Sequence, residues 1–391
     1  MNQTTEHIFA EISKLAPDIT SRAAEIETAR RIPLDLVETL RSIGIFRLFV
    51  PRSHGGLELD LPTGLEVIRA LSRIDGSVGW TAMIGGGNGL VPALLPRDIY
   101  EEIYRNGPDI IIAGSAQPGG TAEVEADGWR VNGRWGFSSG CQHADWIFGL
   151  CVMLKDVEPI PGSTDEVGPP MIRGCFRPAY DWQIEDTWHV GGLKGTGSHH
   201  FSLSDTVVPS AYFFDLMGGT SCLPGALYQA VIQLIPLFHC AFAVGVAEGA
   251  LDALVSLARA GRQQLWAVTP LRDSETFQGA LGRVAAELNA VRAFSEAQIA
   301  GHWRHALAGT LKSEIFFAQA TQTAIWVTSA CVRIVDACFS LGGGSALYEN
   351  SPLQRQLRDM HAAAQHAMVQ ERHYVNGGKL LIGAGGDRQA L

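Results

Sequence analysis

The chain has 391 residues, 46% of them hydrophobic and 18% charged, a composition that excludes a disordered or fibrous protein. Length alone suggests two or three domains. Thirty basic against 40 acidic residues give a net charge of −10, and no basic block is present, so we expect no nucleic-acid partner. The start, MNQTTEHIFAEISKL, lacks the regions of a secretion signal. No run of eighteen residues stays apolar, and we expect a cytoplasmic protein with no membrane span.

The seven cysteines are widely spaced and include no CxxC pair. An odd number without paired spacing argues against both a disulfide framework and a structural zinc site. We therefore expect free, buried thiols and no bound metal.

Residues from about 5 to 108 follow a helical period, in which apolar side chains recur every three or four positions. Pro33 is placed to begin one helix, the stretch 51–56 has the composition of a loop, and Asp75 can cap a helix that begins near Val78. We predict an N-terminal α-helical domain over residues 1–108.

The pattern changes to short alternating runs between about 109 and 215. A strand is predicted at 122–126, followed by turns at Asp127-Gly128 and Asn132-Gly133. Further strands are predicted at 146–154, 170–176 and 200–203. The middle domain, residues 109–215, is therefore a β domain.

The helical period returns from about 225 onward, with apolar residues such as Phe242, Val246, Ala250 and Leu254 on one face. Small residues are frequent there, so these helices can pack closely. We predict a helical bundle over residues 216–391.

Glycine clusters at 85–89 and 342–344 lie in or beside predicted helices. Neither follows a parallel strand as a dinucleotide-binding fingerprint does. The stretch GTGS at 195–198 lacks the lysine arrangement of a P-loop. We expect it to form a tight turn whose backbone N–H groups are free to meet an anion or a ring edge.

Three strings resemble those of a known family. VNGRWGFSSGCQHADW at 131–146 resembles "NGxWxxSSGCxHAxW", GLKGTGS at 192–198 is similar to "GLxGTGS", and QRQLRDMHAAAQH at 354–366 is similar to "QRxxRDxHxxxxH". With the order of the domains, they resemble the acyl-CoA dehydrogenase fold and, within it, the two-component flavin monooxygenases that hydroxylate phenols and other aromatic or heterocyclic compounds. The resemblance spans nearly the whole chain.

The resemblance implies an α+β fold with an N-terminal helical domain, a middle antiparallel β-barrel or sandwich and a C-terminal four-helix bundle. It implies an oxygenase component that receives reduced FMN or FAD from a separate NAD(P)H-dependent reductase and uses O2 to form a C4a-hydroperoxyflavin. The substrate would be a small aromatic or heteroaromatic compound, such as an indole or a phenol, that is hydroxylated or epoxidised. A homotetramer is also implied, and N- or S-oxygenation on the same fold is an alternative reaction.

Positions that match the family's motifs are expected to contact the flavin ring. Ser138 can hydrogen-bond flavin N5 and steady the oxygenated flavin. Phe137 and Ser139 are further contacts, although Ser139 could instead cap the strand end. Ser115 and Gln117 match a loop at the flavin edge, and a plain hairpin loop is the alternative for both.

Three more positions match the segments that bind the flavin phosphates across a subunit interface. These are Arg262, Phe277 and Gly343. Arginine suits a bidentate phosphate contact, and glycine allows a close backbone approach. Complementing a helix dipole is an equally open role for Arg262.

Catalysis is expected at His366, which matches the histidine that the monooxygenases place over the flavin, where it can act as a base or donate toward the peroxide. His361 and His366 are five apart on a predicted helix and face different sides, which excludes a zinc pair. His361 and Trp80 are assigned to the substrate. Asn88 stands where many aromatic hydroxylases have a histidine and is kept as a catalytic and substrate-binding candidate. Because an amide accepts no proton near neutral pH, we expect a substrate that is nucleophilic without deprotonation, such as an indole, an amine or a thioether.

Two other classes of function are open. An acyl-CoA dehydrogenase needs a carboxylate base, but the usual position holds Met368, and Glu248 lies about a turn and a half beyond the alternative position near Phe242. A degenerate flavin-binding scaffold would need no catalytic group. Arg358 is expected to pair with Asp359 or a similar acid and to have only a structural role.

Overall fold

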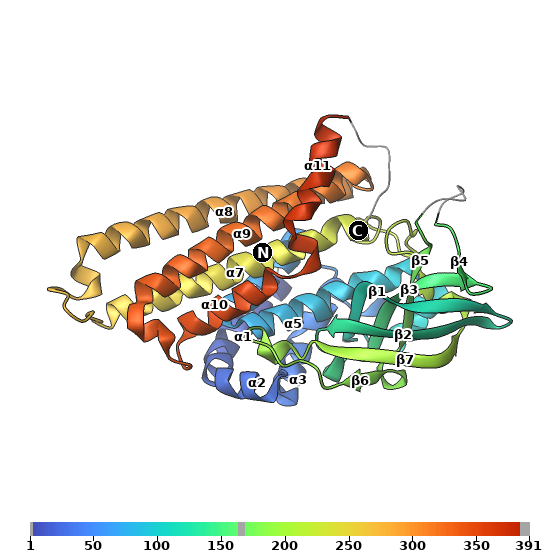
Figure 1. Cartoon of the computed structure of the whole chain (residues 1–391), viewed down its shortest axis with the longest axis horizontal. Helices are drawn as coiled ribbons and strands as arrows, with labels where there is room; N and C mark the ends of the chain where they lie inside the picture. Colours follow the sequence, from blue (N-terminus) through green and yellow to red (C-terminus); the bar gives the residue numbers. More distant parts are fainter. Residues whose placement is uncertain (1–2, 163–168, 384–391) are drawn as a thin grey trace.

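Helices, a sheet and a helical bundle follow one another along the chain (Figure 1). The computed structural model describes residues 3–162 and 169–383. The first helices are α1 (Gln3–Ser21), α2 (Ala23–Ala29), α3 (Leu34–Ile43), α4 (Leu61–Ile74), α5 (Gly76–Gly87) and α6 (Arg97–Ile103).

The starts of these helices confirm the predicted signals. Pro33 immediately precedes α3, and its fixed φ suits a helix start. Asp75 is the N-cap of α5, where its carboxylate accepts the backbone N–H of Val78 at 3.0 Å. Such a cap satisfies a donor that the helix itself leaves unpaired.

The middle of the chain forms one mixed sheet with the strand order β6-β7-β2-β1-β3-β5-β8, and β4 pairs with β3. The strands are β1 (Ile112–Glu125), β2 (Gly128–Ser138), β3 (Trp146–Lys155), β4 (Glu158–Pro159), β5 (Ile172–Pro178), β6 (Gln183–Glu185), β7 (His199–Val208) and β8 (Phe213–Phe214).

One pairing differs from a wholly antiparallel arrangement, because β1 and β3 are parallel. The chain leaves β2 at the end where β1 began, and β7 occupies the outer edge of β2. The next strand, β3, therefore crosses to the free edge of β1 and runs in the same direction as β1.

The turn predicted at Asn132-Gly133 is wrong, because β2 continues through both residues. The pairing of β2 with β7 shifts there, and Asp205 on β7 has a φ of +49°. The side-chain oxygen of Asn132 accepts the N–H of Asp205 at 2.8 Å. Asn132 thus satisfies a β-bulge in the neighbouring strand instead of making a turn.

The C-terminal part is a bundle around a central helix. Its helices are α7 (Val231–Arg259), α8 (Glu275–Leu307), α9 (Glu314–Gly342) and α10 (Pro352–Ala363), followed by the short helix α11 (Tyr374–Leu381). Helix α7 packs against α4 and α5 on one side and against α9 on another. One hydrophobic cluster joins the N-terminal helices to the bundle, and a second fills the sheet.

Close packing of α4 on α7 depends on glycine. A Cβ atom at Gly245 would lie 2.4 Å from the carbonyl oxygen of Arg69, and one at Gly249 would lie 2.3 Å from that of Arg73. The predicted role of small residues in these helices is therefore confirmed at the α4–α7 contact.

Two helical segments are long and apolar enough to cross a membrane, by length and composition alone: α7, and α9 together with the turn that follows it. Of the most apolar window in α7, 94% is buried inside the protein, as in the core helix of a globular fold; for the α9 segment the share is 50%. The expectation that no segment is apolar enough was therefore too simple.

Candidate active site

A β-bulge near the end of β2 decides which side chains face the interior. Trp135 pairs with Phe201 and Ser138 with His199, so β2 has one extra residue between these pairs. Phe137 in the bulge has a φ of +65° and is 66% exposed, whereas Ser138 is fully buried. Strict alternation from the buried Trp135 would have turned Phe137 inward and Ser138 outward. The bulge therefore places the Ser138 hydroxyl inside.

Ser139 is held in a chain of hydroxyl groups that starts at an indole. Trp80 Nε1 donates to Ser139 Oγ at 2.9 Å, Ser139 and Ser198 are 2.7 Å apart, and Ser198 is 2.7 Å from Thr196. Thr196 donates its only hydroxyl proton to the carbonyl of Leu193. Ser198 must then donate to Thr196, and Ser139 to Ser198, which leaves Ser139 no proton for a ligand.

Ser138 is the opposite case. Its Oγ is buried and has no hydrogen-bond partner among the described residues. Buried polar atoms are nearly always paired, and an exception needs an explanation. A hydrogen-bonding ring such as flavin would satisfy it, so the residues present fit that cofactor.

Four aromatic rings from three parts of the chain surround the same place. The ring of Trp80, on α5, has its centroid 5.0 Å from that of Phe242 and 5.6 Å from that of His239, both on α7. The third neighbour is His366, at 5.7 Å. Because Trp80 also bonds to Ser139, the end of β2 adjoins this aromatic cluster.

His366 does not lie on a helix, contrary to the prediction, because α10 ends at Ala363. It caps the 3-10 turn Ala367–Val369, where its Nδ1 accepts the N–H of Met368 at 3.3 Å. The neutral ring therefore carries its proton on Nε2. Desolvation by the surrounding protein lowers its pKa to about 4, although the residue is exposed at the surface.

Sequence reasoning missed His239, which is 4% exposed and packs against both Trp80 and His366. Burial lowers its pKa to about 3. A signal was available, since His239 is the only ionisable side chain other than cysteine in the run VIQLIPLFHCAFAVGVA at 231–247. A polar ring in such a buried helix needs partners.

Four other residues that the sequence predicted for the site make contacts outside the cluster around Trp80. Asn88 ends α5 and donates from Nδ2 to the carbonyl of Ile112 at 3.2 Å, so it ties α5 to β1. Ser115 and Gln117 lie in an irregular part of β1 and not in a hairpin loop, and Ser115 Oγ accepts the N–H of Gln117. His361 is ion-paired with Asp336 at 2.8 Å on an exposed face. The structure does not bring His361 to Trp80.

The three residues predicted for the flavin phosphates lie together at the other end of the bundle. Arg262 is exposed in the loop after α7, Phe277 is in the first turn of α8, and Gly343 follows α9 with a φ of +56°. Gln264, near Arg262, would lie 3.1 Å from a Cβ atom at Gly343. This end is far from the sheet (Figure 1). Within one chain these residues are thus separated from Ser138.

The turn predicted at 195–198 exists, and two of its four N–H groups are paired within the protein. Gly195 N donates to Ser77 Oγ at 3.1 Å and Thr196 N to Leu193 O at 3.1 Å, and Leu193 N, just before the turn, donates to Asp359 Oδ1 at 2.6 Å. The prediction of free N–H groups is therefore wrong for Gly195 and Thr196 and stays a prediction for Gly197 and Ser198. The segment connects α10 and α5 to the hydroxyl chain of Ser139.

Arg358 is structural, as expected, but its partners differ. It pairs with Glu27 at 2.7 Å and donates to the carbonyl of Gly191 at 2.7 Å. Asp359 is occupied by Leu193 instead.

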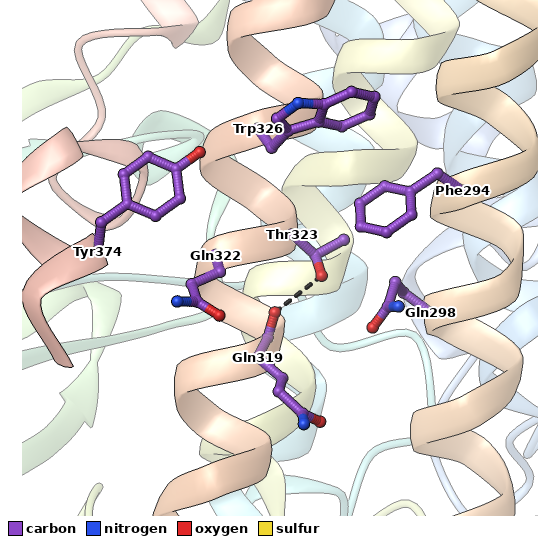
Figure 2. A pocket seen from close by; sticks show the side chains of 7 residues that line it. All are labelled: Phe294, Gln298, Gln319, Gln322, Thr323, Trp326 and Tyr374. Carbon is purple, nitrogen blue, oxygen red and sulfur yellow. Dashed lines mark hydrogen bonds between the residues drawn. The ribbon is translucent and has the colours of Figure 1, made fainter. Parts of the chain in front are cut away.

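A hollow of about 370 Å³ lies elsewhere, on the outer face of α8 and α9 (Figure 2). Phe294 and Trp326 meet there with ring centroids 5.0 Å apart, and Tyr374 from α11 flanks them. Its other lining residues are Gln298, Gln319, Gln322 and Thr323. The hollow shares no residue with the cluster around Trp80.

The carboxylate that a thioester dehydrogenase needs is not available here. Met368 occupies the usual position, in the turn after His366. Glu248 is 7% exposed and is held by the guanidinium groups of Arg69 and Arg292. Its carboxylate is thus engaged by two guanidinium groups and is not free to reach a substrate.

Comparison with known proteins identifies the family. The models of the acyl-CoA dehydrogenase N-terminal and C-terminal domains match residues 4–96 and 237–371. Indole-3-acetate monooxygenase of Pseudomonas putida is 30% identical over 93% of this chain and 90% of that protein. The flavin-dependent monooxygenase oxygenase subunit HsaA of Mycobacterium tuberculosis is 30% identical over 95% and 94%. The structure of XiaF from Streptomyces, in complex with FADH2 and glycerol, superimposes with a TM-score of 0.90 at 25% identity and covers 99% and 98% of the two chains.

These likenesses extend over nearly the whole length of every chain compared, and they agree with the orphaned Ser138 hydroxyl and the missing dehydrogenase base. The chain belongs to the oxygenase components of the flavin-dependent monooxygenases, which are oxidoreductases that use reduced flavin on the acyl-CoA dehydrogenase fold.

Proposed function

We propose that the chain hydroxylates or epoxidises a small aromatic or heteroaromatic compound, with an indole favoured over a phenol. Reduced flavin, delivered by a separate NAD(P)H-dependent reductase, supplies the electrons and, with O2, the oxygen atom that is transferred. The observation that carries the proposal is the buried Ser138 hydroxyl, which has no partner among the described residues and directly precedes Ser139, the residue that binds Trp80 of the Trp80–His366 cluster.

Each residue of the centre has a defined part in this proposal. Ser138 donates to the flavin ring, because Ser139 has no proton to spare. The Ser139 hydroxyl fixes the indole of Trp80, which together with Phe242 forms an apolar wall for the substrate. His366 donates from Nε2 and holds a proton at that atom through the reaction.

Two features favour an indole-like substrate over a phenol. His366 is neutral, and its Nδ1 already accepts the Met368 N–H, so the ring is a donor more than a base. Asn88 uses one of its two amide N–H groups on Ile112, and an amide accepts no proton near neutral pH. Neither group removes a phenolic proton well near neutral pH. The Pseudomonas putida relative named for indole-3-acetate supports this choice.

Arg262, Phe277 and Gly343 are proposed to complete the flavin site of a neighbouring subunit in a homotetramer. Their distance from the sheet supports a shared site (Figure 1). Helix α9 also supports a shared site, because only 50% of its most apolar window is buried inside the chain. A mixture of Arg262→Gln and Ser138→Ala protein, unfolded and refolded together, should regain activity that neither has alone, and no gain would contradict a shared site. We also propose a cytoplasmic location.

The test uses the purified protein with reduced FMN or FAD, O2 and a separate flavin reductase. We expect oxygenated product from indole, more hydrogen peroxide and less product from Ser138→Ala, and slower turnover of phenol than of indole. Anaerobic addition of acyl-CoA to flavin-loaded protein should leave the flavin spectrum unchanged. Reduced flavin that oxidises at the rate seen without protein, with no product from either substrate, would contradict the proposal.

A further inference from the structure

His239 lies next to His366, and both of its ring nitrogens have hydrogen-bond partners. It belongs to the central helix α7 and is 4% exposed. Its Nε2 is 3.2 Å from the carbonyl oxygen of Ala363, and its Nδ1 is 3.1 Å from Oγ1 of Thr328 on α9. A buried ring with both nitrogens paired is held in one orientation.

These contacts determine which nitrogen of His239 carries the proton. A carbonyl oxygen can only accept, so Nε2–H donates to Ala363, and Nδ1 accepts the hydroxyl proton of Thr328. Burial and the neighbouring His366 lower the pKa of His239 to about 3, so the ring is neutral near neutral pH. The Ala363 carbonyl therefore selects the tautomer, and the Thr328 hydroxyl supplies the donor that this tautomer needs at Nδ1.

Thr328 differs from other buried threonines of α9 in the direction of its hydroxyl bond. Thr321 donates to the carbonyl of Phe317 and Thr323 to that of Gln319, each four residues earlier in the same helix. Thr328 is 2% exposed and pairs across to α7. The Thr328 hydroxyl thus connects two helices, whereas the Thr321 hydroxyl bonds only within α9.

The carbonyl of Ala363 links this pair to His366. The same oxygen accepts the backbone N–H of His366 at 3.1 Å, just after α10 ends. The imidazole centroids of His239 and His366 are 5.8 Å apart. His239 therefore bonds to the atom that fixes the backbone of His366.

We propose that Thr328 and His239 are positioning residues for His366: Thr328 holds the His239 ring in one orientation, and His239 anchors the carbonyl that orients the turn carrying His366. The inference rests on the proposed role of His366 as the donor in the site. Without the Thr328 hydroxyl, the buried Nδ1 of His239 is left unpaired and the ring loses its fixed orientation. A ring that turns away no longer holds the Ala363 carbonyl.

The test compares Thr328→Val, which keeps the shape of the side chain, with Thr321→Val as the matched control. Imidazole NMR of the full-length protein reads the tautomer of His239 and the titration of His366. We expect the His239 ring signals to shift and broaden in T328V as the ring loses its fixed orientation, and the pKa of His366 to rise from about 4. Product formed from indole per O2 consumed, with reduced FAD supplied by a reductase, should fall about 10-fold, since small misplacements of a reacting group are costly. T321V should change none of these.

A conservative variant separates positioning from simple damage. His239→Gln can still donate to Ala363 and accept from Thr328. It should therefore retain most of the product formed per O2 consumed, which His239→Leu should lose. Unchanged titration of His366 in T328V would overturn the positioning role, whatever the activity. The titration of His366 could change in T328V while T328V and His366→Ala both form as much product per O2 as wild type. In that case the positioning role would stand and the proposed role of His366 would fail.

Discussion

The neighbouring residues Ser138 and Ser139 differ in whether the hydroxyl has a partner, and this difference predicts opposite mutational effects. Ser138→Ala removes an unpaired buried group, so the flavin-free protein should be as stable as wild type or more stable. Ser139→Ala leaves the Trp80 N–H and Ser198 unpaired and should cost about 1–3 kcal/mol. Urea unfolding without flavin measures both. Equal destabilisation by the two changes would contradict the directional chain of hydroxyl groups.

Two histidines with lowered pKa values predict loss of stability in acid. The folded pKa of His366 is about 4 and that of His239 about 3, both below the ordinary value of 6.5. Stability is therefore complete above pH 6.5 and is lost as the pH falls toward these values, because the unfolded chain binds more protons. The buried His239 contributes a slope of up to about 1.4 kcal/mol per pH unit, and His366 contributes less because it is exposed and screened by solvent. In His366→Gln the unfolding free energy should decrease less between pH 6.5 and pH 4. An identical decrease would exclude His366 as a source.

At the scale of an element, the bulge in β2 stores backbone strain at Phe137. Its φ of +65° is unfavourable for any residue with a Cβ, and its largely exposed ring contributes little packing. Phe137→Gly relieves the strain and Phe137→Ala does not. The glycine variant should therefore be more stable than the alanine variant by about 1 kcal/mol. Thermal unfolding of both checks this, and an alanine variant of equal or higher stability would mean that the bulge relaxes.

The same bulge illustrates what the sequence could and could not predict. Periodicity and capping residues were sufficient for the helices, because Asp75 and Pro33 act locally. Alternation failed near Ser138 because an extra residue in one strand is set by its pairing with β7. Likewise Asn132-Gly133 has turn composition, but its partner strand uses Asn132 at a bulge. Pairing between distant segments overrode local preference in both cases.

For the candidate site, motif positions predicted Ser139, Trp80 and His366, and the structure bonds Ser139 to Trp80 and packs Trp80 against His366. The role of the neighbouring Ser138 stays a prediction. His239 escaped notice because its partners, Thr328 and Ala363, come from two other helices. His361 was misassigned since α10 ends before His366, so the spacing between the two histidines is not helical. Contacts of this kind depend on tertiary packing, which one sequence does not reveal.

At the scale of the whole molecule, Asp359 joins three parts of the fold. It lies on α10, its Oδ1 accepts the N–H of Leu193 before β7, and its Oδ2 would be 2.7 Å from a Cβ atom at Gly76, the first residue of α5. Burial, and then the neighbouring carboxylate of Asp75, raise its pKa well above the ordinary value of 3.8. The junction therefore favours a protonated acid at a place where bundle, sheet and N-terminal helices meet.

This raised pKa predicts that Asp359→Asn gains stability relative to wild type as the pH rises. A raised folded pKa gives stability that is complete below pH 3.8 and is lost as the pH passes the folded pKa, because the unfolded chain releases its proton first. Asparagine keeps an oxygen for Leu193 N and never ionises. The difference in unfolding free energy between D359N and wild type should increase by up to about 1.4 kcal/mol per pH unit above pH 4 and level off beyond the folded pKa. Urea unfolding at several pH values measures it, with Asp127→Asn in the exposed β1–β2 turn as the control for loss of a surface carboxyl group. A flat difference for D359N would mean that Asp359 is ionised in the folded protein, and that Leu193 and Arg358 outweigh its burial.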